Sequence, residues 1–179
     1  MPTGPEPPEG LPPGTYVTLS GGSWSTAAEF QLRGSRLDPD VVTRAVGIEP
    51  SRAHKRGDPI RADAERTFRK GVWSVRSDDA LSRTDDHLED HLRWLLDRLE
   101  PSSTQLRRVV AEEALEAEFW CVVDMQARNC DFALQPETIA RVGALGATLR
   151  LDIYGPGDME PEVIEIPEPS ASAEPPDGR

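Results

Sequence analysis

Two histidines, His87 and His91, have the clearest spacing for chemistry in the sequence. They stand four residues apart on a predicted helix, a spacing at which two imidazoles can hold one metal ion. The run HLEDH also loosely matches the metal-binding motif H-x-x-E-H, with Asp90 in place of the glutamate. However, each histidine directly precedes a leucine of the apolar stripe, and the only other histidine, His54, is distant in the sequence. We therefore treat His87 and His91 as weak metal candidates and assign neither a metal nor a cofactor.

The two cysteines, Cys121 and Cys130, could act as nucleophiles. Both are predicted on strands beside apolar residues, where a packed structural thiol is favoured over a reactive one. The nucleophile elbow G-x-S-x-G, the phosphate loop G-x-x-x-x-G-K and the dinucleotide turn G-x-G-x-x-G do not occur in the chain. We therefore assign no catalytic residue. The sequence leans away from an enzyme without deciding the question.

A basic segment at 51–70 supplies most of the candidates for binding. Its seven Lys and Arg residues outnumber its three acids, and its length without periodicity indicates an exposed loop. The interaction candidates are Trp94 on the long predicted helix and, within the segment, Arg52, His54, Lys55 and Arg56. Nucleic-acid binding is disfavoured, because acids interrupt the segment and only Phe68 adds an aromatic ring for stacking. The partner we expect is another protein.

The net charge of −12 comes largely from the two ends of the chain. Residues 1–14 carry −2 and residues 155–179 carry −6, which leaves −4 for the part between them. Both ends are rich in Pro and poor in large apolar residues. We therefore predict a disordered lead at 1–14, a single domain at 15–155 and a disordered acidic tail at 156–179.

The sequence carries no signal for secretion or for a membrane. The N-terminus has neither a basic nor an apolar signal region, and no apolar run approaches the length of a membrane span. Two cysteines are too few for a disulfide framework, and 179 residues can bury a core without one. We therefore expect a cytoplasmic protein.

Helix and strand signals alternate along the chain. The best-defined helix lies within Leu37–Pro50, where Asp38 is the predicted cap and Gly47 the predicted stop. A longer helix with a stripe of five leucines is predicted to start at Thr84 and to end at Pro101. Two further helices are predicted to start at Thr104 and at Pro136, the latter with Ile139, Val142 and Leu145 facing inward. The predicted strands are Ala28–Leu32, Gly71–Ser77, Glu118–Met125, Cys130–Leu134 and Thr148–Tyr154, with the third and fourth joined as a hairpin that keeps the cysteines apart.

The segment Leu134–Gly146 echoes the segment that begins at Leu37, with matching proline, acidic, apolar and arginine positions. Each segment follows a predicted strand and precedes another, so the chain reads as two strand–helix–strand halves. The echo reflects either a duplication or the shared rules of helix capping, and both explanations stay open. The order of elements predicts an α+β fold with helices packed on one face of a mainly antiparallel sheet.

Four segments carry a resemblance to a known family. They are Leu37–Asp58 (LDPDVVTRAVGIEPSRAHKRGD), Gly71–Ser77 (GVWSVRS), Leu88–Pro101 (LEDHLRWLLDRLEP) and Leu145–Tyr154 (LGATLRLDIY). From about Phe30 to Tyr154 the chain resembles the bacterial family of domains of unknown function 4279. The resemblance is to an overall pattern, and it implies neither a reaction nor site residues.

Two functions remain open at this point. The first is a non-enzymatic protein-interaction module, in its sharpest form an immunity-type protein that neutralises a toxin. It is based on the missing catalytic motifs and on the contrast between the basic segment and residues 78–124, which hold thirteen acids against five arginines. The alternative is a small-ligand or metal-binding protein, or an enzyme, with a cleft between the two halves. Asp152, Tyr154, His87 or the basic segment would then lie at its mouth.

Overall fold

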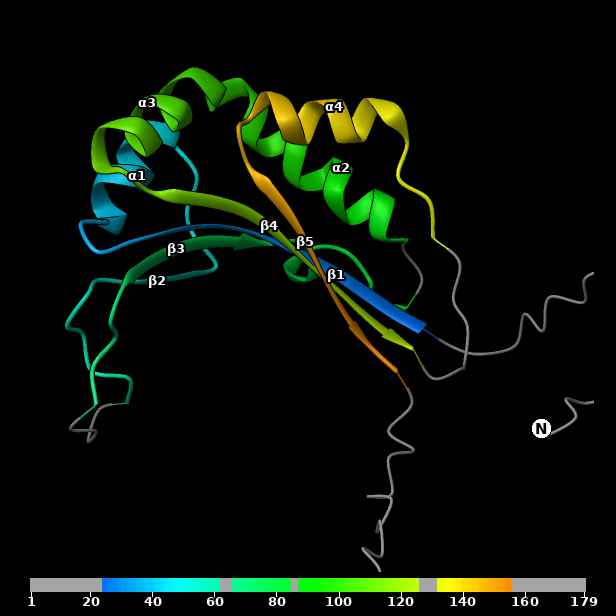
Figure 1. Ribbon diagram of the computed structural model, residues 1–179, viewed down its shortest axis with the longest axis horizontal. Helices are drawn as coiled ribbons and strands as arrows, with labels where there is room; N and C mark the ends of the chain where they lie inside the picture. Colours follow the sequence, from blue (N-terminus) through cyan, green and yellow to red (C-terminus); the bar gives the residue numbers. More distant parts are fainter. Residues whose placement is uncertain (1–23, 62–65, 85–86, 126–131, 156–179) are drawn as a thin grey trace, which may run out of the picture.

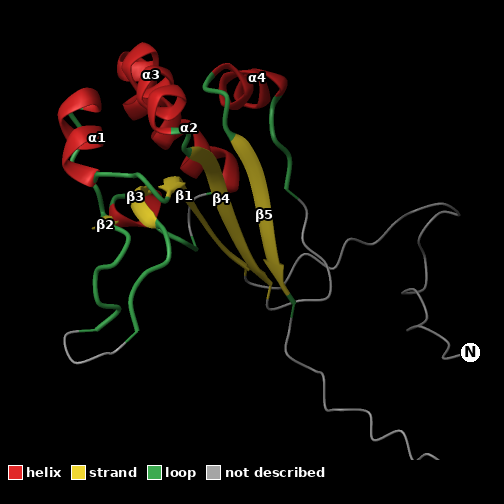
Figure 2. Ribbon diagram, turned by 60° about the vertical axis from the view of Figure 1, so that its left-hand side comes forward, coloured by secondary structure: helices red, strands yellow, loops and turns green. Residues whose placement is uncertain are grey.

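The computed structural model describes residues 24–61, 66–84, 87–125 and 132–155. Within these ranges one five-stranded sheet carries four α-helices on one of its faces (Figures 1 and 2). The predicted α+β architecture is thereby confirmed. None of the described helices combines the length and the apolar character that crossing a membrane requires. The predictions for residues 1–14 and 156–179 lie outside the described residues.

The sheet is mixed but mostly antiparallel, in the order β2-β3-β1-β4-β5. Its strands are β1 (Trp24–Gly34), β2 (Arg52–His54), β3 (Gly71–Arg76), β4 (Glu116–Met125) and β5 (Thr148–Tyr154). The pair β4–β5 is parallel, and the other three pairs are antiparallel. The predicted loop at 51–70 therefore contributes a short edge strand, β2, which pairs with β3 through Arg52, Ala53 and His54.

The central strand β1 separates the two faces of the sheet by strict alternation. Phe30 and Leu32 are fully buried beneath the helices, and the Phe30 ring packs 5.0 Å from that of Phe119. Because successive side chains of a strand point to opposite faces, Glu29, Gln31 and Arg33 project to the other side. The sequence pattern of β1 thus places a polar row at the middle of the helix-free face.

The first helix, α1 (Pro39–Val46), has the ends that its sequence predicts. The backbone N–H of Asp40 donates to the Asp38 carboxylate at 3.1 Å, and Gly47 adopts a left-handed conformation with φ of 70°. The helix buries Val42 and Val46 against the sheet and the neighbouring helices.

The leucine stripe of α2 (Leu88–Leu99) is buried as predicted, but the helix begins later than Thr84. Its N-cap is His87, whose backbone N–H donates to the Asp90 carboxylate at 3.1 Å, so the first turn closes there. A short 3₁₀ turn, Glu100–Ser102, follows α2. The next helix, α3 (Ser103–Glu113), therefore starts before the predicted cap, Thr104.

The predicted hairpin of β4 with Cys130–Leu134 is wrong. β4 lies between β1 and β5, and Cys121 stands opposite Ala28 on one side and Leu151 on the other. The long antiparallel match with β1 covers ten residue pairs, a far larger pairing than a short hairpin offers. The segment 132–134 contains no strand, and Cys130 lies outside the described residues.

The two predicted halves are connected differently, so a duplication is not shown. The helix α4 (Pro136–Ala144) joins the parallel strands β4 and β5, whereas α1 follows β1, whose neighbour β3 is antiparallel. On α4 the predicted inward Ile139 is 52% exposed, while Val142 is buried. Arg141 bonds to Asp97 of α2 and to Glu100 of the 3₁₀ turn that follows it, and these bonds hold α4 against α2.

The edge strand β5 is less buried than its alternating pattern suggests. Leu151 and Ile153 point to the helix-covered side, but they are 42% and 49% exposed. The helical layer covers only the start of β5 (Figure 2), so these two side chains lie beyond it.

Candidate functional site

We call the face of the sheet opposite the helices the open face (Figure 2). By register, polar side chains of all five strands lie on this face. By register its central members are Arg52 and His54 of β2, Ser74 and Arg76 of β3, Glu29, Gln31 and Arg33 of β1, Glu118, Trp120 and Val122 of β4, and Arg150, Asp152 and Tyr154 of β5. Two neighbouring hollows lie on this face, and Arg52 and Trp120 line both.

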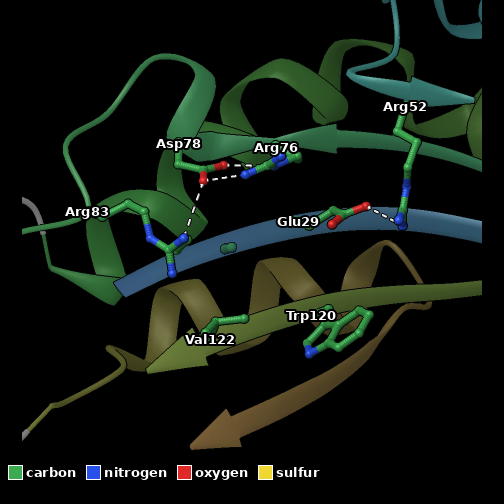
Figure 3. Close-up of a pocket in the computed structure, with 9 residues that line it drawn as sticks. Glu29, Arg52, Arg76, Asp78, Arg83, Trp120 and Val122 are labelled. Atoms are coloured by element: carbon green, nitrogen blue, oxygen red, sulfur yellow. Dashed lines mark hydrogen bonds and ion pairs between the residues drawn. The ribbon is translucent and has the colours of Figure 1, made fainter. Parts of the chain in front are cut away.

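The first hollow, which we call the paired hollow, has a volume of about 230 Å³ (Figure 3). Its charged lining consists of Glu29, Arg52, Arg76, Asp78 and Arg83, and Trp120 and Val122 form its apolar part. Each acid faces an arginine, as the dashed lines of Figure 3 show. The charges of this hollow are therefore largely neutralised within it.

Asp78 organises the charges of the paired hollow. Its carboxylate accepts from Arg76 Nε at 3.0 Å and from Arg76 Nη2 at 2.5 Å, and Arg83 Nη1 lies 3.9 Å away. The side chain is only 9% exposed, and this burial raises the pKa of Asp78. The hydrogen bonds and charge of Arg76, with the charge of Arg83, outweigh burial and hold the pKa below its ordinary value. Asp78 is thus a fixed anion at neutral pH.

Trp120 lines both hollows from the middle of β4. Its indole Nε1 donates to the Asp152 carboxylate at 3.3 Å, and the Tyr154 hydroxyl donates to the same carboxylate at 2.8 Å. The hydrogen bond to Asp152 raises the pKa of Tyr154, because deprotonation would remove the donor. The bond to Asp152 holds the indole of Trp120, which is partly exposed.

The second hollow, which we call the basic hollow, has a volume of about 530 Å³. It is lined by Gln31, Arg33, Arg52, His54, Phe68, Arg69, Lys70, Val72 and Trp120, a set without an acid. The rings of His54 and Phe68 stack with centroids 3.6 Å apart. Burial lowers the pKa of His54 and the charge of Arg52 lowers it further, against a smaller opposing effect of Asp58. The imidazole is therefore neutral at pH 7 and adds a ring rather than a charge.

The cations of the basic hollow are only partly neutralised. Lys70 bonds to Glu116 at 2.7 Å at the margin of the hollow. In the described part of the chain, Arg33 and Arg69 have no acidic side chain within ion-pair distance. Gln31 is 1% exposed, and its amide Nε2 has no hydrogen-bond partner.

Two of the five predicted interaction residues, Arg52 and His54, lie on the open face. Lys55 instead bonds to Asp38 at 3.0 Å, close to the N-terminus of α1, and Arg56 is exposed in the turn after β2. Trp94 lies on α2 in the helical layer, partly buried, with the Arg98 guanidinium 4.8 Å from its ring centroid. The structure therefore does not bring the five residues together.

The predicted metal candidates also lie apart from the open face. His91 is fully buried, with Nδ1 2.8 Å from the Ser77 hydroxyl, whereas His87 is exposed and its ring lies 6.3 Å from that of Trp24. Among the described residues, no three His, Cys, Asp or Glu side chains are grouped so that they could hold a metal ion. Cys121 is fully buried, and burial raises its pKa to about 12, so its thiolate is not accessible at neutral pH.

The Ser77 hydroxyl joins the sheet to the helical layer. It donates to the carbonyl of Ala28 at 2.8 Å and accepts from the backbone N–H of Ala28 at 2.9 Å. Since its single proton goes to Ala28, the contact with His91 requires that the imidazole Nδ1–H donates. The hydroxyl thus continues the β1–β3 ladder past its last backbone pair, at Arg76.

Sequence reasoning missed Gln31, Arg33 and Trp120 as site residues. A signal existed for the first two, since the alternation that marks Phe30 and Leu32 as buried also marks a polar row on the other face. Trp120 carried no such signal, because the same residue type on a strand packs equally well into a core.

The comparisons with known proteins give one match. Residues 24–156 match a family model described as Domain of unknown function (DUF4279). No curated protein and no solved structure matches the chain.

Proposed function

Since the chain belongs to the family of domains of unknown function DUF4279, whose description names no reaction, we propose a role in binding. The protein is a non-enzymatic protein-interaction module that binds a partner protein on its open face. The observation that carries this proposal is the paired hollow, where a partly exposed Trp120 lies among three arginines on the face of the sheet without helices.

The residue types of the paired hollow support a protein partner. Trp and Arg are the residues most enriched among those that dominate the energy of protein–protein contacts. Trp120 and Val122 offer apolar area, and the arginines Arg76 and Arg83 keep about half of their side chains accessible at the rim. An accessible ring that its own hydrogen bond fixes loses little conformational entropy on binding.

The size of the paired hollow supports the same conclusion. Its volume of about 230 Å³ is below the roughly 300–1,000 Å³ that is typical of small-molecule pockets. It matches one or two side chains of a protein. Three arginines face two acids in the lining, so a partner segment that inserts an apolar side chain flanked by acidic residues is complementary.

The chemistry of the described residues favours binding over catalysis. The only described thiol, Cys121, is buried, and His91 is used inside the fold. Asp78 of the paired hollow is held as an anion by Arg76 and Arg83, which makes it a poor proton donor or acceptor at neutral pH. The immunity-type role stays a prediction, and its toxin would be the partner on this face.

A pair of charge reversals tests the proposal. Proteins captured from the native host by the full chain are purified, and their affinity is measured for the wild type, Arg83→Glu and Arg107→Glu. Arg83 lines the paired hollow, whereas Arg107 is exposed on α3 in the helical layer. We expect Arg83→Glu to weaken binding at least tenfold and Arg107→Glu to retain it. Equal affinities for the wild type and Arg83→Glu would reject the open face as the interface.

A further inference from the structure

The basic hollow holds more positive charge than its surroundings neutralise. Among the residues that the structure describes, four cationic side chains and no acidic one line it. Arg52 and Lys70 have acidic partners at its margin, whereas Arg33 and Arg69 have none among the described residues. Glu116 lies opposite Arg33 on β4 and interacts with its charge, but Glu116 is bonded to Lys70, so the hollow keeps an excess of positive charge. This is the charge that a phosphate monoester, which carries roughly −1.5 to −2 at neutral pH, would balance.

The basic hollow also contains a buried hydrogen-bond donor without an acceptor, the side-chain amide of Gln31. Gln31 lies in this hollow between Ser74 on β3 and Glu118 on β4, its two neighbours across the sheet. Glu118 is bonded to Arg150, and the Ser74 hydroxyl donates to the Arg52 carbonyl at 3.5 Å. Neither neighbour satisfies the Gln31 amide, whose Nε2 is buried without a partner. A ligand oxygen above Gln31 would supply the missing acceptor.

The hollow is larger than a phosphate group. Its volume of about 530 Å³ falls inside the range of small-molecule pockets, roughly 300–1,000 Å³, unlike that of the paired hollow. Trp120 and the stacked pair of His54 and Phe68 add flat ring surfaces to its lining. The bound molecule therefore has an aromatic or other flat part next to its anionic group.

From these three observations we propose that the basic hollow binds a small phosphate-bearing molecule with a planar ring. Arg33 and Arg69 bind the phosphate, Gln31 donates to one of its oxygens, and the ring lies against Trp120. A nucleoside monophosphate is the simplest molecule of this description. Guanidinium groups suit this task, because their paired N–H donors match two phosphate oxygens at once.

This site shares Arg52 and Trp120 with the protein interface proposed above, but other residues allow the two proposals to be tested separately. Arg33 and Arg69 line the basic hollow but not the paired hollow, and Arg83 lines the paired hollow but not the basic hollow. Arg83→Glu therefore impairs partner binding without changing phosphate binding, and Arg33→Gln does the reverse. The failure of one proposal leaves the other measurable.

Titration calorimetry of the full chain with adenosine monophosphate, inorganic phosphate, adenosine and citrate tests the site. We expect binding of adenosine monophosphate, weaker binding of phosphate, and no heat with adenosine or citrate. Arg33→Gln and Arg69→Gln should each weaken the binding of adenosine monophosphate about tenfold. The matched control Arg108→Gln removes the same charge from α3, where Arg108 bonds to Glu112, and should bind like the wild type.

Gln31→Leu adds a test that separates binding from folding. The variant removes an amide that has no partner in the fold, so its midpoint of urea unfolding should not fall. Its affinity for adenosine monophosphate should fall several-fold. The proposal is overturned if neither adenosine monophosphate nor phosphate binds, if citrate alone binds, or if Arg108→Gln weakens binding as much as Arg33→Gln does.

Discussion

The two hollows of the open face share Arg52 and Trp120, yet their charges are satisfied in different ways. In the paired hollow every acid bonds to or faces an arginine, and Asp78 is nearly buried between two of them. In the basic hollow none of the described lining residues is an acid, and the buried amide of Gln31 has no hydrogen-bond partner. The acids of the paired hollow are therefore satisfied within the fold, whereas the polar groups of the basic hollow can still take a ligand.

The difference shows that charge counts along a sequence say little about charge in a site. The basic segment at 51–70 carries a surplus of four positive charges by count, but the fold distributes them. Lys55 bonds to Asp38 and Lys70 bonds to Glu116. Arg33, which lies outside the segment on β1, adds a positive charge to the basic hollow. The charge of the basic hollow thus comes from β1 and from the basic segment together, and the composition of one segment does not predict it.

If the polar groups of the paired hollow are satisfied within the fold, the loss of the hydrogen bonds beneath it should lower the stability most. Ser77→Ala removes the hydroxyl that bonds to both backbone groups of Ala28, a residue that lines this hollow. The same hydroxyl also contacts His91. Because buried groups are left without partners, we expect the free energy of unfolding to fall by about 3 kcal/mol in urea titrations. Ser77→Thr, which keeps the hydroxyl, is the control. A loss below about 1 kcal/mol for Ser77→Ala would show that this network does not support the hollow.

The ion pairs themselves should contribute the next largest effect. Asp78→Ala leaves Arg76 without the carboxylate that accepts two of its hydrogen bonds. We expect a loss of about 2 kcal/mol, less than for a fully buried pair because Arg76 is 46% exposed. Chemical denaturation of Asp78→Ala measures this value, with Asp79→Ala as the neighbouring control. Equal stabilities of the two variants would mean that the paired hollow is no better satisfied than its surroundings.

Local signals in the sequence predicted the elements well, because capping and periodicity act over a few residues. The cap Asp38 and the stop Gly47 are where the sequence places them, and the leucine stripe of α2 is buried. The pairing of β4 was mispredicted, because β1 lies some ninety residues away in the sequence and offers a longer match than a hairpin. The exposure of Ile153 was also missed, since it depends on how far the helical layer extends over β5.

The site was harder to predict than the fold. Arg52 and His54 were chosen from the basic segment, and both line the basic hollow. Gln31, Arg33 and Trp120 were not, because only the alignment of three strands brings them to one surface. A strand carries information about its two faces, but the sequence does not say which face the helices leave uncovered.

The pH dependence of stability should also distinguish the paired hollow from the basic hollow. The folded pKa of Asp78 lies below its ordinary value, so its ion pairs are fully stabilising above the unfolded pKa, near pH 4. That stability is lost as the pH falls through the folded pKa. The unfolding midpoint of the wild type should therefore drop more steeply below about pH 5 than that of Asp78→Asn. Parallel curves for the two proteins would show that Asp78 does not titrate with folding.

The smallest effect on stability should come from the basic hollow. Arg33→Gln removes a cation that forms no ion pair with the described residues and that lines the same hollow as Arg69 and Lys70. We expect the free energy of unfolding to change by less than about 0.5 kcal/mol, with any change toward greater stability at low salt. Added salt should abolish that gain, because it screens the repulsion that the substitution relieves. A loss of more than about 1 kcal/mol would show that Arg33 serves the fold. The basic hollow would then be satisfied in the same way as the paired one.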